Sequence, residues 1–393
     1  MTPAAVGTLQ VAIVADLLEE RWPSMDLVAD MLMEHVADDQ SGITAALVRP
    51  SFAAKLPAWT RARGQQVPTV ERIAHRFWSY PRWLEKQERD KQGHADVYHI
   101  VDHSYAHLAD SLPANRVVIT CHDVDAFRSL LLPEESESQL PHFLAKRVLT
   151  GFRSAAAIVC DSEATRSELV QHGIVPVERT SVVPIGVHPS CTPESDAVAD
   201  TIAAKLTGEA GPADILHVGS TIPRKQIDVL LEIVAQTAAV NPAVKLWRVG
   251  GAFTPEQAER ARELGIEDRI TVLPFITRAV LASVYRRAAL VLLPSSREGF
   301  GLPVIEAMAC GTPIICSDLP VLREVGGNAA EYCPAAEPSA WASRIVAMLH
   351  ERSVSHSAWA TRRTAGLARA SRFTWAACAD AMRKVYLHVA NGD

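Results

Sequence analysis

Short apolar segments rich in valine and isoleucine alternate with stretches of helical period along the whole chain. Most of these segments are apolar on both faces, which is typical of parallel strands covered by helices on either side. Such alternation predicts right-handed βαβ units and doubly wound sheets. The predicted strands are residues 9–15, 43–48, 97–101, 116–121, 156–160 and 180–184 in the first half and 213–218, 243–249, 269–273, 288–293 and 313–316 in the second.

The chain has 393 residues, which suits two domains of this kind better than one. Turn-forming prolines and glycines gather between residues 184 and 212, so we expect the two domains to meet there. Open α/β sheets bind ligands beyond the carboxyl ends of their strands. The sequence therefore predicts an α/β protein with two Rossmann-like, doubly wound domains that face each other across an interdomain cleft.

Composition and charge exclude several classes of protein. Hydrophobic residues make up 48% and charged residues 21%, the balance of a globular chain with real cores. No apolar run is long enough to span a bilayer, and no basic segment precedes the first strand, so no signal peptide is expected. The net charge of -6 argues against a nucleic-acid partner. Seven cysteines without a C-x-x-C pair indicate reduced thiols and a cytoplasmic location.

One segment departs from this average. Residues 55–91 hold nine Lys/Arg and four Asp/Glu, a local charge of +5. Two interpretations fit this segment: an amphipathic surface that contacts anionic lipid at the inner face of a membrane, or a solvated helix-loop pair that covers the sheet, with its aromatic residues in the core. The second is favoured because such a charge is common over this length. The segment also contains the aromatic residues Trp59, Phe77, Trp78, Tyr80 and Trp83.

Residues 294–313 (PSSREGFGLPVIEAMACGTP) give the strongest functional signal. They predict a strand end, a loop with Gly299 and Gly301, and a helix that opens at about Pro303, because proline suits the first helical position. The amides of residues 300–304 are then free, and with the helix dipole they form a site for an anion such as a phosphate. The two glycines let a ligand approach the backbone closely.

Two carboxylates flank this predicted anion site. Glu298 precedes the glycines and Glu306 lies one turn into the helix. Beside a phosphate, ionised carboxylates suit hydroxyl groups, so phosphate and hydroxyls together indicate a nucleotide-sugar ligand. Glu306 could instead complement the helix dipole, and a hydrolase pair is disfavoured because both residues lie on one loop–helix turn. Arg224 and Lys225 precede another predicted helix, where cations are unfavourable without an anion, which favours an anionic ligand there too.

The segment from Glu298 to Pro313 resembles the donor-binding segment of family-4 retaining glycosyltransferases of the GT-B fold, with Glu298 and Glu306 as the E-x7-E pair. The resemblance continues through Val218-Gly219-Ser220 with Pro223-Arg224-Lys225, and through Val249-Gly250-Gly251. Weaker signatures lie in the first half, at His122-Asp123 and at residues 184–187. The similarity covers nearly the whole chain, with 51–94 the least familiar part.

The resemblance implies a role for each matching residue. Glu298 would approach the hydroxyls of the transferred sugar, and Glu306 would hold the ribose hydroxyls. His122 would lie near the sugar as a second catalytic residue. Arg224 and Lys225 would neutralise the diphosphate as the leaving group gains charge. The implied donor-binding residues are Gly219, Arg224, Lys225, Gly299, Phe300, Gly301 and Glu306.

The family also implies an organisation and an activity. The N-terminal domain, residues 1–190, would bind the acceptor, and the C-terminal domain, residues 191–372, the donor, with a last helix at 373–393 packed back on the first domain. The enzyme would move a hexose, from GDP-mannose or a UDP-hexose, to a hydroxyl of a glycan, a lipid-linked glycan or a small acceptor. No cofactor or metal is expected, and Asp123-Val124-Asp125 is disfavoured as a metal site. Alternatives are a sugar-nucleotide epimerase, a phosphorylase and a catalytically silent homologue that binds nucleotide-sugar.

Two positions depart from the family pattern. The first loop often has two glycines near the donor phosphates, whereas here it contains Trp22-Pro23-Ser24-Met25, so the Ser24 hydroxyl or the Met25 amide would take their place. Many members have an arginine directly after the first glycine of the C-terminal domain, where this chain has Ser220. Arg224 would then carry more of the phosphate charge. His99, His103 and His107 lie near a strand end and either line the cleft or pack in the core.

Overall fold

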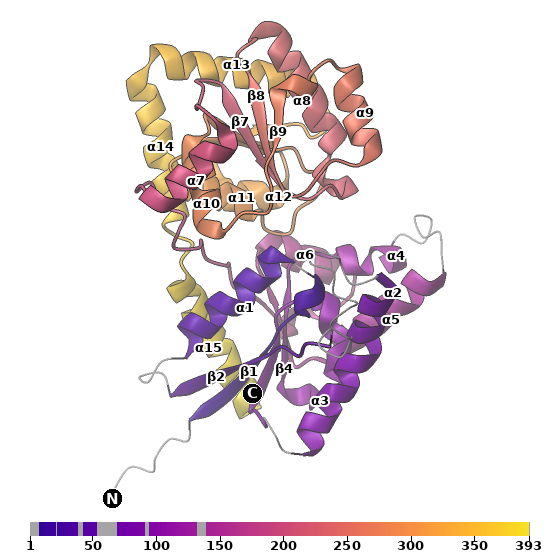
Figure 1. The fold of residues 1–393 in the computed structure, drawn as a ribbon. Coiled ribbons are helices and arrows are strands. Elements are labelled where there is room, and N and C mark those ends of the chain that lie inside the picture. The colour runs from indigo at the N-terminus through magenta and orange to yellow at the C-terminus, as the bar shows by residue number, and fades with distance from the viewer. Residues whose placement is uncertain are drawn as a thin grey trace, which may run out of the picture. The chain divides into compact units, whose positions relative to one another are not determined.

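The computed structural model describes residues 8–20, 22–37, 42–52, 69–90, 94–131 and 139–392. The chain divides into two compact units (Figure 1). Unit 1 contains Met1–Gly186 together with Trp375–Asp393, and unit 2 contains Val187–Thr374. The sequence had placed these boundaries at residues 190 and 372.

Unit 1 is built on a parallel six-stranded sheet of order β2-β1-β3-β4-β5-β6. The three central strands β3, β4 and β5 are buried at every residue, because helices cover both faces. The strand order reverses between β1 and β3, which is the point where open α/β sheets bind ligands. The strands are β1 (Leu9–Val14), β2 (Ile43–Val48), β3 (Val97–Ile100), β4 (Val117–Cys121), β5 (Ala157–Cys160) and β6 (Thr180–Val182).

Two helices from opposite ends of the chain lie side by side in unit 1 (Figure 1). Arg383 Nε of the C-terminal helix α15 donates to the Val36 carbonyl at the end of α1, at 3.1 Å. Tyr386 Oη of α15 lies 2.8 Å from His99 Nδ1 in the buried core. The C-terminal segment is therefore an integral part of unit 1. The helices are α1 (Pro23–Val36), α2 (Thr69–Ala74), α3 (Tyr80–Arg89), α4 (Arg128–Leu131), α5 (Gln139–Ser154), α6 (Glu163–Gln171) and α15 (Trp375–Asn391).

Unit 2 repeats the architecture with a parallel sheet of order β12-β11-β10-β7-β8-β9. Here the order reverses between β7 and β10. The strands are β7 (Asp214–Val218), β8 (Lys245–Val249), β9 (Ile270–Val272), β10 (Leu290–Leu293), β11 (Ile314–Ser317) and β12 (Glu331–Cys333). The helices are α7 (Ala197–Thr207), α8 (Ile227–Val240), α9 (Pro255–Glu263), α10 (Arg278–Arg287), α11 (Leu302–Ala309), α12 (Pro320–Gly326), α13 (Pro338–Val354) and α14 (His356–Ala370).

Local sequence explains where these elements begin. Helix α9 starts at Pro255 because Thr254 and Gln257 form a reciprocal capping box, in which each side chain bonds the other residue's backbone amide. All eleven predicted strands are present, and the α/β fold class with two doubly wound parallel sheets is confirmed. The sequence missed β12, an edge strand of only three residues, Glu331–Cys333.

The basic segment 55–91 is described only for residues 69–90, and Trp59 lies outside the described residues. Phe77 and Tyr80 are buried, and Trp83 packs against the core of unit 1, while Trp78 is 40% exposed. Most of the described aromatic side chains therefore serve the core. Among the described residues, no helix is both long and apolar enough to cross a membrane. All seven cysteines are free thiols.

Candidate functional site

The predicted donor residues of unit 2 lie in the two loops at the point where its strand order reverses. The loop after β7 contains Gly219 and ends in a short helical turn, Pro223–Lys225. The loop after β10 runs from Pro294 to the start of α11. The Ser296 amide donates to the Arg224 carbonyl at 2.9 Å and joins the loops. Ligands of open α/β sheets bind at such a reversal.

Glu298 is the centre of a charged cluster that joins both loops. Its Oε1 accepts from Lys225 Nζ at 2.5 Å and from Ser295 Oγ at 2.7 Å, and its Oε2 accepts from Arg224 Nη1 at 3.0 Å. The carboxylate is only 6% exposed, whereas the Arg224 side chain is 19% exposed. Burial alone would raise the pKa of Glu298, but the adjacent Lys225 and Arg224 cations outweigh burial and lower it.

This cluster changes one inference from the sequence. The sequence indicated that Arg224 and Lys225 need an anion from outside the chain, but Glu298 already supplies one. Both Glu298 oxygens accept from protein donors, three hydrogen bonds in all, so in this state the carboxylate mainly holds the two cations. The next residue, Gln226, has φ of 50°, the only positive φ at a non-glycine residue within the described ranges. Strain of this kind gathers at functional sites.

Glu306 lies on α11 and is held by a residue that the sequence analysis missed. Tyr285 Oη on α10 donates to Glu306 Oε2 at 2.8 Å. Burial raises the pKa of Glu306, and the hydrogen bond from Tyr285 and the charge of Arg278 only partly oppose this. The Glu306 side chain is partly exposed, and in the described part of the chain no residue bonds its Oε1. That oxygen is able to accept a ligand hydroxyl.

The start of α11 has the backbone geometry of an anion site. Gly301 precedes the helix with φ of 95°, and an added Cβ would lie 2.5 Å from Leu322 Cδ2, so only glycine fits. Pro303 has no N–H, and the Val304 amide donates to the Gly301 carbonyl at 2.8 Å, so the prediction of free amides over residues 300–304 is wrong for these two residues. The amides of residues 300–302 have no acceptor in the described part of the chain. The Phe300 ring packs edge-on against Phe373, with centroids 5.7 Å apart. Phe300 therefore anchors the loop by its side chain and can offer a ligand only its backbone.

The remaining predicted site residues belong to unit 1. His122 follows β4, and its Nδ1 lies 2.5 Å from Asp161 Oδ2 while its Nε2 lies 2.7 Å from the Val101 carbonyl. Burial opposes the charged ring, but Asp161 prevails, so the pKa of His122 rises to about 10. Both ring nitrogens are therefore protonated donors to protein oxygens at neutral pH. His122 can act toward a ligand through its charge, but not as a base.

The loop that departs from the family pattern starts α1. Ser24 is exposed in the first turn of this helix. The Met25 amide donates to the Trp22 carbonyl at 3.0 Å, so it is not free to replace a glycine amide. Of the two residues, Ser24 alone has an exposed group to offer.

The other histidines and the D-x-D sequence have structural partners. His99 bonds Tyr386 and Thr120, and His107 bonds the Arg76 carbonyl, so both belong to the core. His103 lies 3.3 Å from Asp123. No cluster of potential metal ligands occurs in the ranges that the structure describes.

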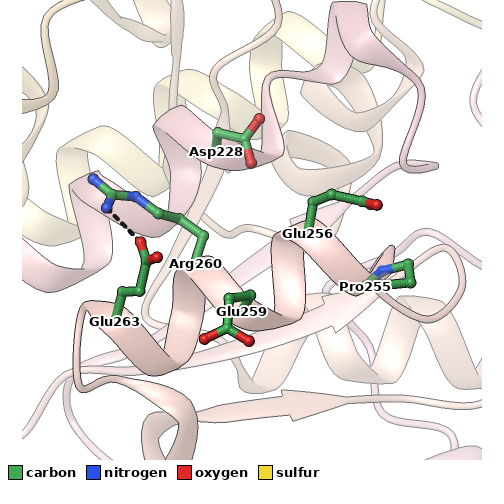
Figure 2. A pocket seen from close by; sticks show the side chains of 6 residues that line it. All are labelled: Asp228, Pro255, Glu256, Glu259, Arg260 and Glu263. Carbon is green, nitrogen blue, oxygen red and sulfur yellow. Dashed lines mark hydrogen bonds and ion pairs between the residues drawn. The ribbon is translucent and has the colours of Figure 1, made fainter.

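A surface hollow lies elsewhere in unit 2, between the start of α8 and α9 (Figure 2). Four of its six lining residues are acidic, and Arg260 Nη1 bonds Glu263 Oε2 across one turn of α9 at 2.9 Å. None of the predicted donor residues lines this hollow. Its one cation, Arg260, is already paired with Glu263 and Glu232, so the hollow is a poor site for a diphosphate.

Comparison with known proteins assigns both halves of the chain. Residues 198–363 match the family model of glycosyl transferases group 1, and residues 31–190 match that of glycosyltransferase family 4. The chain is 31% identical to a D-inositol 3-phosphate glycosyltransferase from Segniliparus rotundus over 76% of this chain and 68% of the relative. It is 29% identical to O-antigen chain mannosyltransferase B from Escherichia coli over 67% and 68%.

Solved structures match the fold. Sucrose-phosphate synthase from Thermosynechococcus elongatus superposes with a TM-score of 0.73 at 20% identity, over 98% of this chain and 100% of that one. Anabaena Alr3699/HepE in complex with UDP and glucose superposes with a TM-score of 0.71 at 17% identity, over 96% and 99%. The fold and the matches define a glycosyltransferase of GT-B type. The chain belongs to the family-4 GT-B glycosyltransferases.

Proposed function

We propose that this transferase is a retaining, metal-independent hexosyltransferase that uses a nucleoside diphosphate sugar as donor and a hydroxyl of a glycan, a lipid-linked glycan or a small molecule as acceptor. The single observation that carries the donor assignment is the cluster of Arg224, Lys225 and Glu298 at the strand reversal of unit 2. GDP-mannose or a UDP-hexose is the proposed donor. A mannosyltransferase among the relatives supports the first, and a structural neighbour bound to UDP and glucose supports the second.

The cluster suggests how the leaving group is stabilised. As the bond from sugar to phosphate breaks, negative charge grows on the diphosphate, and Arg224 and Lys225 are preplaced cations for it. Glu298 holds both cations in position before the donor arrives. When the donor binds, its diphosphate replaces Glu298 in part of these contacts. The departing phosphate oxygen takes the acceptor proton, because His122 has no free nitrogen to act as base.

The location and the membrane contact stay predictions. A protein that modifies lipid-linked glycans would work in the cytoplasm at the inner face of the membrane. The exposed side chains Val70 and Trp78, in the described part of the basic segment, are the candidates for such a contact.

A thermal-shift panel of UDP-, GDP-, ADP- and dTDP-sugars tests the proposal. Stabilisation by one class at concentrations far above Kd would raise the melting temperature by mass action and identify the donor base. Incubation with that donor alone separates an epimerase, which would alter the sugar, from a transferase. Nucleotide binding without turnover over a wide acceptor panel would instead indicate a silent homologue. A chain stabilised by no nucleotide would contradict the proposal.

Replacing Glu306 with alanine tests the assignment of the ribose. We expect Glu306→Ala to weaken binding of the stabilising nucleoside diphosphate by about tenfold or more, the usual contribution of a hydrogen bond to a carboxylate. The same substitution should weaken binding of the 2′-deoxy analogue of that nucleotide much less. Titration calorimetry with both nucleotides measures the difference, and Glu263→Ala, on exposed α9, is the matched control. Equal losses for both nucleotides would refute the ribose contact.

A further inference from the structure

Arg248 on β8 is a fully buried cation without a carboxylate partner in the part of the chain that the structure describes. Its Nη1 donates to the Gly251 carbonyl, and its Nη2 donates to the Gly219 carbonyl at 3.2 Å. Its Cζ lies 5.0 Å from the centroid of the Phe253 ring. Burial lowers the pKa of Arg248 to about 10, so the group stays charged at neutral pH. A buried charge without a counter-ion is costly, which calls for a functional reason.

The two carbonyls that Arg248 holds belong to the loops after β7 and β8. In a trans peptide, the N–H of the next residue points opposite to the carbonyl. Because the Gly219 carbonyl points at Arg248, the Ser220 amide points away from Arg248. Neither Ser220 nor Ala252 donates its amide to any described backbone or side-chain acceptor. Arg248 therefore orients two free amides.

The loops are packed so closely that this orientation is fixed. Gly250 has φ of 131°, and a Cβ added there would lie 1.9 Å from the Gly219 carbonyl oxygen. His217 lies beneath the same loop, with its Cε1 3.1 Å from a Cβ added at Gly219. Burial, with the charges of Arg248 and Lys225, lowers the pKa of His217 to about 3, so the ring is neutral. The charge beneath the loop is therefore that of Arg248.

The geometry points to Arg248 as a positioning residue of the donor site, which aims the Ser220 amide at the donor diphosphate and adds a buried positive charge behind it. This inference rests on the proposed function. Arg224 and Lys225 follow in the same loop, so a diphosphate bound there would meet the Ser220 amide together with these two cations, with Arg248 behind the loop. Ser220 occupies the position where many family members have an arginine, and Arg248 supplies a charge to that loop from the neighbouring strand.

Two substitutions of Ser220 isolate the amide. Ser220→Pro removes the N–H, whereas Ser220→Ala removes only the hydroxyl. We expect the proline variant to bind the nucleoside diphosphate that stabilises the parent about tenfold more weakly than the alanine variant. Affinity for the corresponding nucleoside, which has no phosphate, should be the same in both. Equal diphosphate affinity in the two variants would overturn the role of the amide.

Substitutions of Arg248 provide a second test of the inference that does not require a proline in the loop. Arg248→Met should weaken diphosphate binding by about tenfold or more without changing nucleoside binding. Arg248→Lys keeps the charge but loses the forked guanidinium, so its diphosphate affinity should lie between those of the parent and Arg248→Met. A merely structural role would weaken both ligands alike, and that result would overturn the inference. A parent chain that binds no nucleoside diphosphate would instead refute the proposed function. Calorimetry on the full chain, with circular dichroism for folding, makes the measurements.

Discussion

Replacing Glu298 with alanine lowers the rate of sugar transfer by at least about 100-fold and leaves affinity for the free nucleoside diphosphate undiminished. The reason for the first effect is that Glu298 fixes Lys225 at 2.5 Å and Arg224 at 3.0 Å before the donor binds. Loss of preorganised charge at a leaving group typically costs two to three orders of magnitude, about 3–4 kcal/mol in the transition state. The reason for the second is that the Glu298 carboxylate and a diphosphate compete for the same cations.

Steady-state kinetics and calorimetry together measure this divergence. The Glu298→Gln variant keeps the shape of the side chain but not its charge. It should likewise transfer sugar more slowly and keep its affinity for the nucleoside diphosphate. Without Glu298 two partly buried cations lose their counter-ion, so the free protein is less stable, and added nucleotide should raise its melting temperature more than that of the parent. Glu259→Ala, on the exposed face of α9, is the control. Nucleotide affinity that falls as far as the transfer rate would contradict the competition.

Much of the fold could be predicted because the strands follow a local rule. The segments 290–293 and 314–316 are buried on both faces, and each is an unbroken apolar run, which marks it as a covered strand. Strand β12 contains Glu331 and Tyr332, which are only partly buried at the sheet edge, so no apolar run marks it. The pattern fails where burial is one-sided and pairing depends on a neighbouring strand.

The site could be predicted in its residues but not in its contacts. Glu298 and Lys225 are 73 positions apart in sequence, so their ion pair depends on the two loops meeting where the strand order reverses. His122 was a candidate from its strand-end position, yet its state is set by Asp161, the partner across the next strand. Tyr285 and Arg248 looked like ordinary helix and strand residues. No local signal distinguishes them, because their importance comes from which oxygens they bond.

Acidification from pH 7.5 to pH 5 should destabilise the protein strongly. His99, His107 and His217 are buried, and burial lowers the pKa of each to about 3. In the unfolded chain the pKa returns to about 6.5, so below that pH the unfolded state binds more protons and stability falls. Each ring costs about 2 kcal/mol at pH 5, so the two rings of unit 1 together remove a large part of the roughly 5–15 kcal/mol that stabilises a typical domain.

The sign of the effect differs for His122, which defines a window of maximum stability. Asp161 overcomes burial and raises the pKa of His122 to about 10. Its contribution is complete below about pH 6.5 and is lost as the pH rises through 10, so it does not add to the acid effect. Stability should therefore be greatest near neutral pH. It should decline toward acid pH because of the buried neutral rings and toward alkaline pH because of His122.

Hydrogen exchange of peptides covering β3 in unit 1 and β7 in unit 2 follows the two units separately. Unit 1 contains His99 and His107, and the contribution of His122 is complete below about pH 6.5. We therefore expect the loss of protection of unit 1 between pH 6.5 and 5, corrected for intrinsic exchange, to be about twice that of unit 2 in free energy. His217→Leu removes the one buried neutral ring assigned to unit 2 and should abolish most of that unit's acid loss. The exposed His172→Asn serves as control. An unchanged acid loss in His217→Leu would show that carboxylates, and not the buried rings, set the acid limit.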